Sequence, residues 1–175
     1  MINLFNLFFD TEFTHVQQPL DPTPPGLISI GLVSEDGTRT FYAENADVRP
    51  ELFSDFVKET VVPLLEGGDA RIPHVEIAQR LKIWIEGFDG EVKMWSDAPY
   101  WDWMHVKNLF DPHGWPANLI QKPIALAFPS SIQTQRFKAA VEDVFRSNQS
   151  LRRHHALDDA IVNRAAFLRA TERRF

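Results

Sequence analysis

An apolar run near the start of the chain leads directly into two acidic residues, and this feature most constrains the fold. Residues 2–9 are predominantly apolar, and Asp10 and Glu12 follow with one residue between them. In a β-strand, residues i and i+2 point to the same side, so the two carboxylates converge on one point. A strand that is buried on both faces accommodates two such acids only beside a counter-charge. A metal ion and an Arg side chain are the usual solutions.

The composition is that of a globular protein. The chain has 175 residues, 44% of them hydrophobic, which favours one domain over residues 1–175 with a sizeable core. It contains no cysteine, which excludes disulfides, thiolate metal sites and Cys nucleophiles, and a reducing cytoplasm is expected. The apolar run at the start is short, is broken by Asn residues and lacks a preceding positive charge. We therefore expect neither a signal peptide nor a membrane partner.

The charge is distributed unevenly along the chain. The net charge is −6, yet residues 146–175 contain seven Arg and three acidic residues, a local charge of +4. A basic segment on an acidic body is compatible with a nucleic-acid partner. A solvent-exposed, Arg-rich helix explains the same composition equally well.

The hydrophobic pattern predicts an α/β domain. Strands are expected at 2–9, 27–34, 38–43, 91–95 and 122–128. Helices are expected at 50–63, 73–88, 100–110, 132–145 and 156–173. Asp36-Gly37 is a strong turn signal that joins the second and third strands as a hairpin. The order of elements predicts a mixed five-stranded sheet that begins with an antiparallel meander and carries helices on its faces.

A second signal lies near the end of the chain. His154 is followed five residues later by Asp159, a spacing that no other His of the chain shows. The His lies in the loop before a predicted helix, and the Asp lies in the first turn of that helix. The loop leaves the imidazole free to reach a substrate, while the helix fixes the carboxylate. Acids in a first helical turn also complement the helix dipole, without any further role.

A third signal is Asp102, which directly follows Trp101 near the start of the predicted helix at 100–110. Together, in this order, the three signals resemble the three motifs of the DEDDh 3′–5′ exonuclease superfamily. This superfamily includes oligoribonuclease, ribonuclease T and the proofreading subunit of bacterial DNA polymerase III. Small single-domain exoribonucleases of bacteria and phages are nearest in size. The resemblance spans residues 4–166 and implies a ribonuclease H-like fold.

The resemblance also implies a two-metal site that hydrolyses phosphodiesters. Asp10 would bridge two Mg²⁺ or Mn²⁺ ions, and Glu12 and Asp159 would ligate one of them. Asp102 would act on the other ion through water. His154 would be the general base that deprotonates the attacking water. The product would be a nucleoside 5′-monophosphate released from the 3′ end.

Two assignments stay open between neighbouring residues. The second motif often has Asn shortly before its aromatic-Asp pair, and this chain has Asp97 in that region instead. The motif acid is therefore Asp102 or Asp97. Asp102 is favoured by its aromatic neighbour, and Asp97 is interpreted as a helix cap. His155 is an alternative base, although Asp159 follows it by four residues rather than five.

Contacts with nucleic acid are expected around the motifs. Thr11 would lie against the terminal nucleotide, and the rings of Phe13, Trp101 and Trp103 would stack on bases or belong to the core. Arg152 and Arg153 would contact phosphates. The expected substrate is single-stranded or 3′-tailed, RNA is favoured, and related enzymes are often homodimers. The alternatives are a DNA-directed exonuclease, a ribonuclease H-type endonuclease and a non-catalytic nucleic-acid-binding module.

Overall fold

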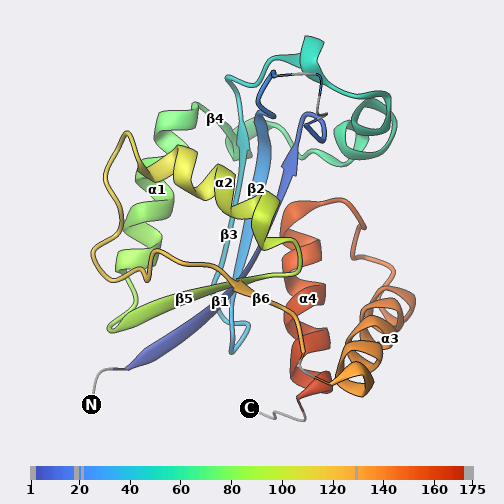
Figure 1. The fold of residues 1–175 in the computed structure, drawn as a ribbon. Helices are drawn as coiled ribbons and strands as arrows, with labels where there is room; N and C mark the ends of the chain where they lie inside the picture. Colours follow the sequence, from blue (N-terminus) through green and yellow to red (C-terminus); the bar gives the residue numbers. More distant parts are fainter. Residues whose placement is uncertain (1–2, 18–19, 21, 129, 172–175) are drawn as a thin grey trace.

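A computed structural model describes residues 3–17, 20, 22–128 and 130–171, and Figure 1 shows their arrangement. The strands are β1 (Leu4–Phe13), β2 (Leu27–Ser34), β3 (Thr40–Asn45), β4 (Arg71–Ile72), β5 (Glu91–Ser96) and β6 (Ile124–Ala125). The α-helices are α1 (His74–Glu86), α2 (Pro99–Phe110), α3 (Ser131–Ser147) and α4 (Ala156–Ala170). None of the described helices is long and apolar enough to cross a membrane.

The strands form one mixed sheet in the order β4-β3-β2-β1-β5-β6. β1 is antiparallel to β2 and parallel to β5, and β2 is antiparallel to β3, so the predicted meander is confirmed. The last pair between β1 and β5 is Phe8 with Trp95. β1 continues to Phe13 beyond this pair. Its acidic residues therefore project past the end of β5, where the sheet leaves room for a site.

The alternation of side chains along β1 divides the core in two. Leu7 and Phe9 are fully buried in a cluster with residues of α1 and α2. Phe8 points to the other face, where it packs with residues of α3 and α4. Apolar residues on both faces make β1 a central, doubly covered strand. Its position explains why the polar end of β1 lies between the two helical layers.

A glycine in β2 brings α4 close to the sheet. A side chain at Gly31 would place its Cβ 2.2 Å from the backbone nitrogen of Leu157, a distance that no residue tolerates. Gly31 is also the partner of Asp10 in the β1–β2 ladder. The first turn of α4 therefore lies directly against the strand pair that carries the first motif.

The structure corrects several expected boundaries. The sheet has six strands rather than five, because the two-residue β4 pairs with the end of β3. The expected helix at 50–63 is wrong: this segment forms the 3₁₀ turns Pro50–Leu52 and Val62–Leu64 and the π-helical turn Val57–Val61. Pro63, near the end of the segment, removes a backbone donor that a continuous α-helix needs. The expected strand at 122–128 is reduced to β6, which has Pro123 on its N-terminal side.

Other differences are small. β1 runs four residues further than expected and contains the first motif rather than ending before it. The turn between β2 and β3 has a positive φ at Gly37, but not at Asp36. The expected elements at residue 2 and at 172–173 lie outside the described residues.

Candidate active site

Carboxylates and one imidazole converge at the end of β1 around a cavity of about 260 Å³. They form two groups, and the candidate ligand atoms within each group lie within 4.8 Å of one another. The histidine cluster consists of Glu12, His154 and Asp159. The aspartate cluster consists of Asp10, Asp97 and Asp102. The five residues of the sequence motifs thus lie together, joined by Asp97.

Asp102 is the most firmly held carboxylate of the site. It is 1% exposed, and the Thr11 hydroxyl donates a hydrogen bond of 2.6 Å to its Oδ1. The Ser96 hydroxyl donates to its Oδ2. Burial raises the pKa of Asp102 to about 7, and the two hydroxyl donors oppose this shift. Both oxygens are therefore engaged by the protein, and the carboxylate has one defined orientation.

Asp97 lies at the open side of the aspartate cluster. Its side chain is exposed, and the Asn163 amide of α4 donates to its Oδ1 at 2.9 Å. The interpretation of Asp97 as a helix cap is wrong, because α2 begins after Ala98 without a side-chain cap. Instead, the Ser96 hydroxyl accepts a hydrogen bond of 2.9 Å from the Ala98 backbone N–H. Asp97 therefore does not cap α2.

The histidine cluster is held mainly by backbone. The His154 N–H donates to the Asp159 carboxylate at 2.8 Å, and the edge of the Phe56 ring meets the imidazole with ring centres 5.1 Å apart. His154 is the single non-glycine residue with positive φ in the described part of the chain, at 67°. Such a conformation costs roughly 1–3 kcal/mol and is common at functional sites. Burial and the charge of Arg153 lower the pKa of His154.

His155 occupies a different environment. Its side chain is 1% exposed and stacks on Tyr42 with ring centres 4.5 Å apart. It is the N-cap of α4, and its Nδ1 accepts from the Asp158 N–H at 3.4 Å. The structure therefore brings His154 to the carboxylates and places His155 in the packing beneath the loop.

The acidic groups of the site raise one another's pKa values. Burial raises the pKa of Glu12 to about 8, and the charges of Asp159 and Asp102 add to the effect. Burial likewise raises the pKa of Asp159 to about 7, although the hydrogen bond from the His154 N–H acts to lower it. Asp10 is raised well above its ordinary pKa by burial and then by its acidic neighbours. A bound cation would remove this repulsion, and carboxylate oxygens are the ligands that Mg²⁺ and Mn²⁺ prefer.

Arginine does not supply the counter-charge in the described part of the chain. Arg153 lines the cavity, but its guanidinium pairs with Glu142 at 3.0 Å and lies over the Phe145 ring. Arg152 pairs with Asp158 at 2.7 Å. Arg152 and Arg153 are thus both engaged with acids of the same molecule. This arrangement favours the metal over the Arg solution for the first motif.

The predicted substrate-contact residues lie in two places. Thr11, Phe13 and Arg153 line the cavity. Trp101 does not line it, but stacks on Phe13 with ring centres 6.2 Å apart. Trp101 lies instead in a neighbouring groove.

Three residues around the cavity were not predicted from the sequence, namely Asn163, Ser96 and Phe56. Asn163 lies four residues after Asp159 on α4, so helical spacing places both on one face. Ser96 ends β5 beside the cavity, and this position depends on strand register. Phe56 reaches His154 from a π-helical turn, and only tertiary contacts reveal this.

The same fold occurs in solved 3′-exonucleases. A structure of S. pombe Pop2p with Mg²⁺ and Mn²⁺ matches with a TM-score of 0.62 and 16% identity, covering 97% of this chain and 84% of that chain. The nuclease domain of 3′hExo, a DEDDh family member bound to rAMP, matches with a TM-score of 0.51 and 16% identity, covering 94% and 90% of the two chains. The chain thus shares its fold with the nuclease domain of a DEDDh family member.

A third structure, of a 3′-exonuclease in 3′-end-specific recognition of a histone mRNA stem-loop, matches with a TM-score of 0.54 and 12% identity. It covers 95% of this chain and 64% of that chain. No family model and no curated protein sequence matches the chain. The predicted ribonuclease H-like fold is thus confirmed through structure, at identities that leave little signal in sequence.

Proposed function

We propose that the protein is a metal-dependent 3′–5′ exonuclease that acts on RNA and releases nucleoside 5′-monophosphates. The observation that carries this proposal is the convergence of Asp10, Glu12, Asp102, His154 and Asp159 on one cavity of a DEDDh-type fold. An imidazole and carboxylates in this arrangement suit the hydrolysis of a phosphodiester.

The residues present fit a pair of divalent cations. Both clusters offer hard oxygen ligands, and the carboxyl pKa values of Asp10 and Glu12 are raised first by burial and then by their acidic neighbours. Asp10, Glu12 and Asp159 would hold the ions directly, and Asp102 would act through water. When bound, the ions would orient the phosphodiester and stabilise negative charge on its oxygens.

The protein's own residues account for proton transfer. The lowered pKa leaves the His154 imidazole neutral near pH 7, so it can accept the proton of the attacking water. The hydrogen bond from its backbone N–H to Asp159 fixes the loop, and the Phe56 edge limits rotation of the ring. Thr11 keeps the Asp102 carboxylate in place.

RNA is proposed as the substrate on two grounds. One structural neighbour is bound to rAMP, a ribonucleotide, and another recognises a histone mRNA stem-loop. A DNA-directed exonuclease would use the same carboxylates, so substrate choice depends on contacts with the 2′-hydroxyl.

Parallel digestion of 3′-tailed RNA and DNA tests the proposal. With Mg²⁺, we expect RNA to yield a ladder of single-nucleotide steps and nucleoside 5′-monophosphates, and EDTA to abolish it. Faster digestion of DNA would overturn the substrate assignment. Internal cuts would indicate an endonuclease of ribonuclease H type. Binding without any hydrolysis would indicate a non-catalytic module.

A further inference from the structure

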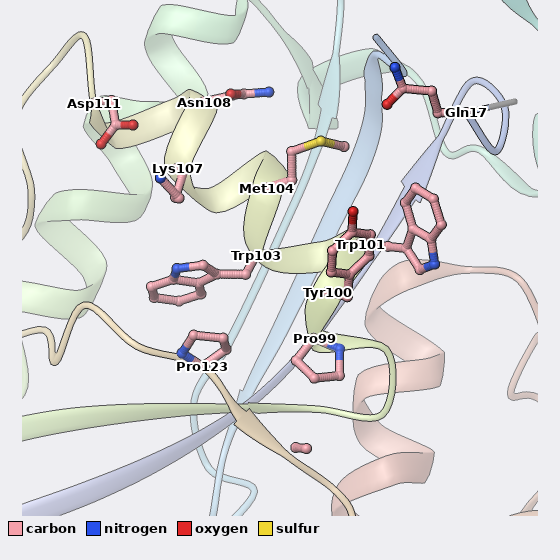
Figure 2. Close-up of a pocket in the computed structure, with 11 residues that line it drawn as sticks. Gln17, Pro99, Tyr100, Trp101, Trp103, Met104, Lys107, Asn108, Asp111 and Pro123 are labelled. Carbon is pink, nitrogen blue, oxygen red and sulfur yellow. The ribbon is translucent and has the colours of Figure 1, made fainter. Parts of the chain in front are cut away.

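A groove of about 620 Å³ runs along α2 beside the catalytic cavity, and Figure 2 shows the residues that line it. Most of them form a stripe at helical spacing on α2. The stripe consists of Tyr100, Trp103, Met104, Lys107, Asn108 and Asp111. We propose that this groove binds the unpaired nucleotides that precede the 3′ end of the substrate strand. The inference rests on the proposed exonuclease function and specifies where its substrate lies.

The groove adjoins the catalytic cavity, and stacked aromatic rings lie between the two. Pro99 and Trp101 line the groove, and Ala98, between them and the carboxylates, lines the cavity. Phe13 lines the cavity and stacks on Trp101 with an angle of 24° between the rings. A strand whose terminal nucleotide lies among the carboxylates would therefore pass Phe13 and Trp101 to reach the groove.

The start of the groove is an aromatic platform. Tyr100 is 80% exposed, and its ring meets Trp101 edge to face with centres 5.0 Å apart. Of the large apolar side chains that the described surface exposes, only Tyr100 and Phe56 are aromatic, and both flank the cavity. Nucleobases of any sequence stack on exposed aromatic rings. The platform thus suits a strand that is bound without base selection.

Charge also favours a nucleic-acid strand here. Lys107 lies two helical turns beyond Tyr100, is exposed, and makes no ion pair with the described residues. The Asp111 carboxylate at the far end accepts a hydrogen bond of 3.0 Å from the Trp115 indole. The pocket on the other side of the site contains Glu51, and its described lining includes no Lys or Arg. A phosphate backbone is therefore better accommodated along α2.

Hydrolysis of RNA oligonucleotides of two to eight nucleotides tests the groove. In the unmodified protein we expect KM to fall as the strand lengthens. Tyr100→Ala, at the start of the groove, should raise KM from the shortest strands on, whereas Lys107→Ala, two turns further along, should raise KM for long strands by roughly fivefold to tenfold while leaving dinucleotide hydrolysis unchanged. Ile132→Ala and Lys138→Ala, exposed residues of α3, are the matched controls. Equal KM changes for all lengths in Lys107→Ala, or no change in either groove variant, would overturn the inference.

Binding gives a readout that is independent of turnover. In a His154→Ala background with Mg²⁺, fluorescence anisotropy of a dye-labelled octanucleotide should show the same losses, and Lys107→Ala should lower the salt slope by about 0.7. Such binding losses without any hydrolysis by the unmodified protein would support the groove while refuting the exonuclease proposal. If Tyr100→Ala instead splits a dimer in sedimentation and leaves length dependence intact, the groove binds a second copy and the inference is wrong.

Discussion

The two clusters of the site differ in how their acids are held. In the aspartate cluster, side chains fix the carboxylates: two hydroxyls hold Asp102 and an amide holds Asp97. In the histidine cluster, a backbone N–H in a strained loop meets Asp159. Rigid side-chain networks suit a group that keeps its charge and position. A loop suits a group that must exchange a proton with solvent. The aspartate cluster thus depends on side chains from several elements, and the histidine cluster depends on the conformation of the loop at His154.

Removing Asp10 should have the largest effect, because its charge acts on both clusters. We expect Asp10→Asn to lower kcat by at least about 10³-fold, since metal-based stabilisation is worth several kcal/mol. Mg²⁺ titration by calorimetry should show weakened binding in the same variant. Asp89→Asn is the matched control, because Asp89 belongs to the other Asp-x-Glu pair, on the surface. Full activity in Asp10→Asn would refute the two-metal assignment.

Substitution of His154, the proposed general base, should lower the rate of hydrolysis without weakening metal binding. We expect His154→Ala to lower kcat by about 10²–10⁴-fold, the usual contribution of a general base, with Mg²⁺ affinity nearly unchanged. His155→Ala should instead lower the melting temperature, because it empties a buried site against Tyr42. If His155→Ala is folded yet inactive while His154→Ala retains turnover, the roles are reversed.

The two acids of the second motif can be ranked by substitution. Asp102→Asn should lower kcat by about 10²-fold, because Asp102 is the buried, fixed carboxylate of the aspartate cluster. Asp97→Asn should cost about tenfold, since Asp97 is exposed and adds charge at the rim. Rates and Mg²⁺ affinities of both variants, measured side by side, decide the order. The opposite ranking would make Asp97 the motif acid.

The smallest expected effect is a pH dependence of stability in the metal-free protein. The raised pKa values mean that the folded state holds protons which the unfolded state has lost, so stability falls as pH rises through them. Between pH 6.5 and 8.5, we expect the melting temperature to drop by a few degrees. The lower limit avoids the buried histidines, whose lowered pKa values act in the opposite sense below it.

Glu12→Gln tests this pH effect directly. The variant should show a flatter decline, because the carboxyl with a pKa of about 8 is gone. Saturating Mg²⁺ should restore the melting temperature of the unmodified protein most strongly at the high end of the range. An identical slope in both proteins would show that the acids of the site are not the cause.

The motifs and the central sheet could be predicted from the sequence because their signals are local. A continuous apolar run marks β1, and the five-residue spacing between His154 and Asp159 can be seen in the sequence alone. The grouping of these side chains into two clusters was harder to predict, because it depends on which helices and strands pack against one another. Asp97 and Asn163 are 66 residues apart and share a hydrogen bond only through the packing of α4.

Local pattern also failed where tertiary contacts override propensity. The segment that carries Phe56 has helical spacing, yet it forms a π-helical turn that turns this ring toward His154. β4 has two residues and leaves no periodic trace in the sequence. The π-helical turn and β4 arise from long-range packing, so they could not be predicted from the pattern of neighbouring residues.

Gly31 is required by the packing of α4 on β2 and not by the acids of the cavity. The contact of α4 with β2 needs a position without a side chain, whether or not the cavity is active. A relative that had lost its acids but kept this helix against this strand would still need glycine there. Glycine at this position is therefore a requirement of the architecture that is independent of the acids in the cavity.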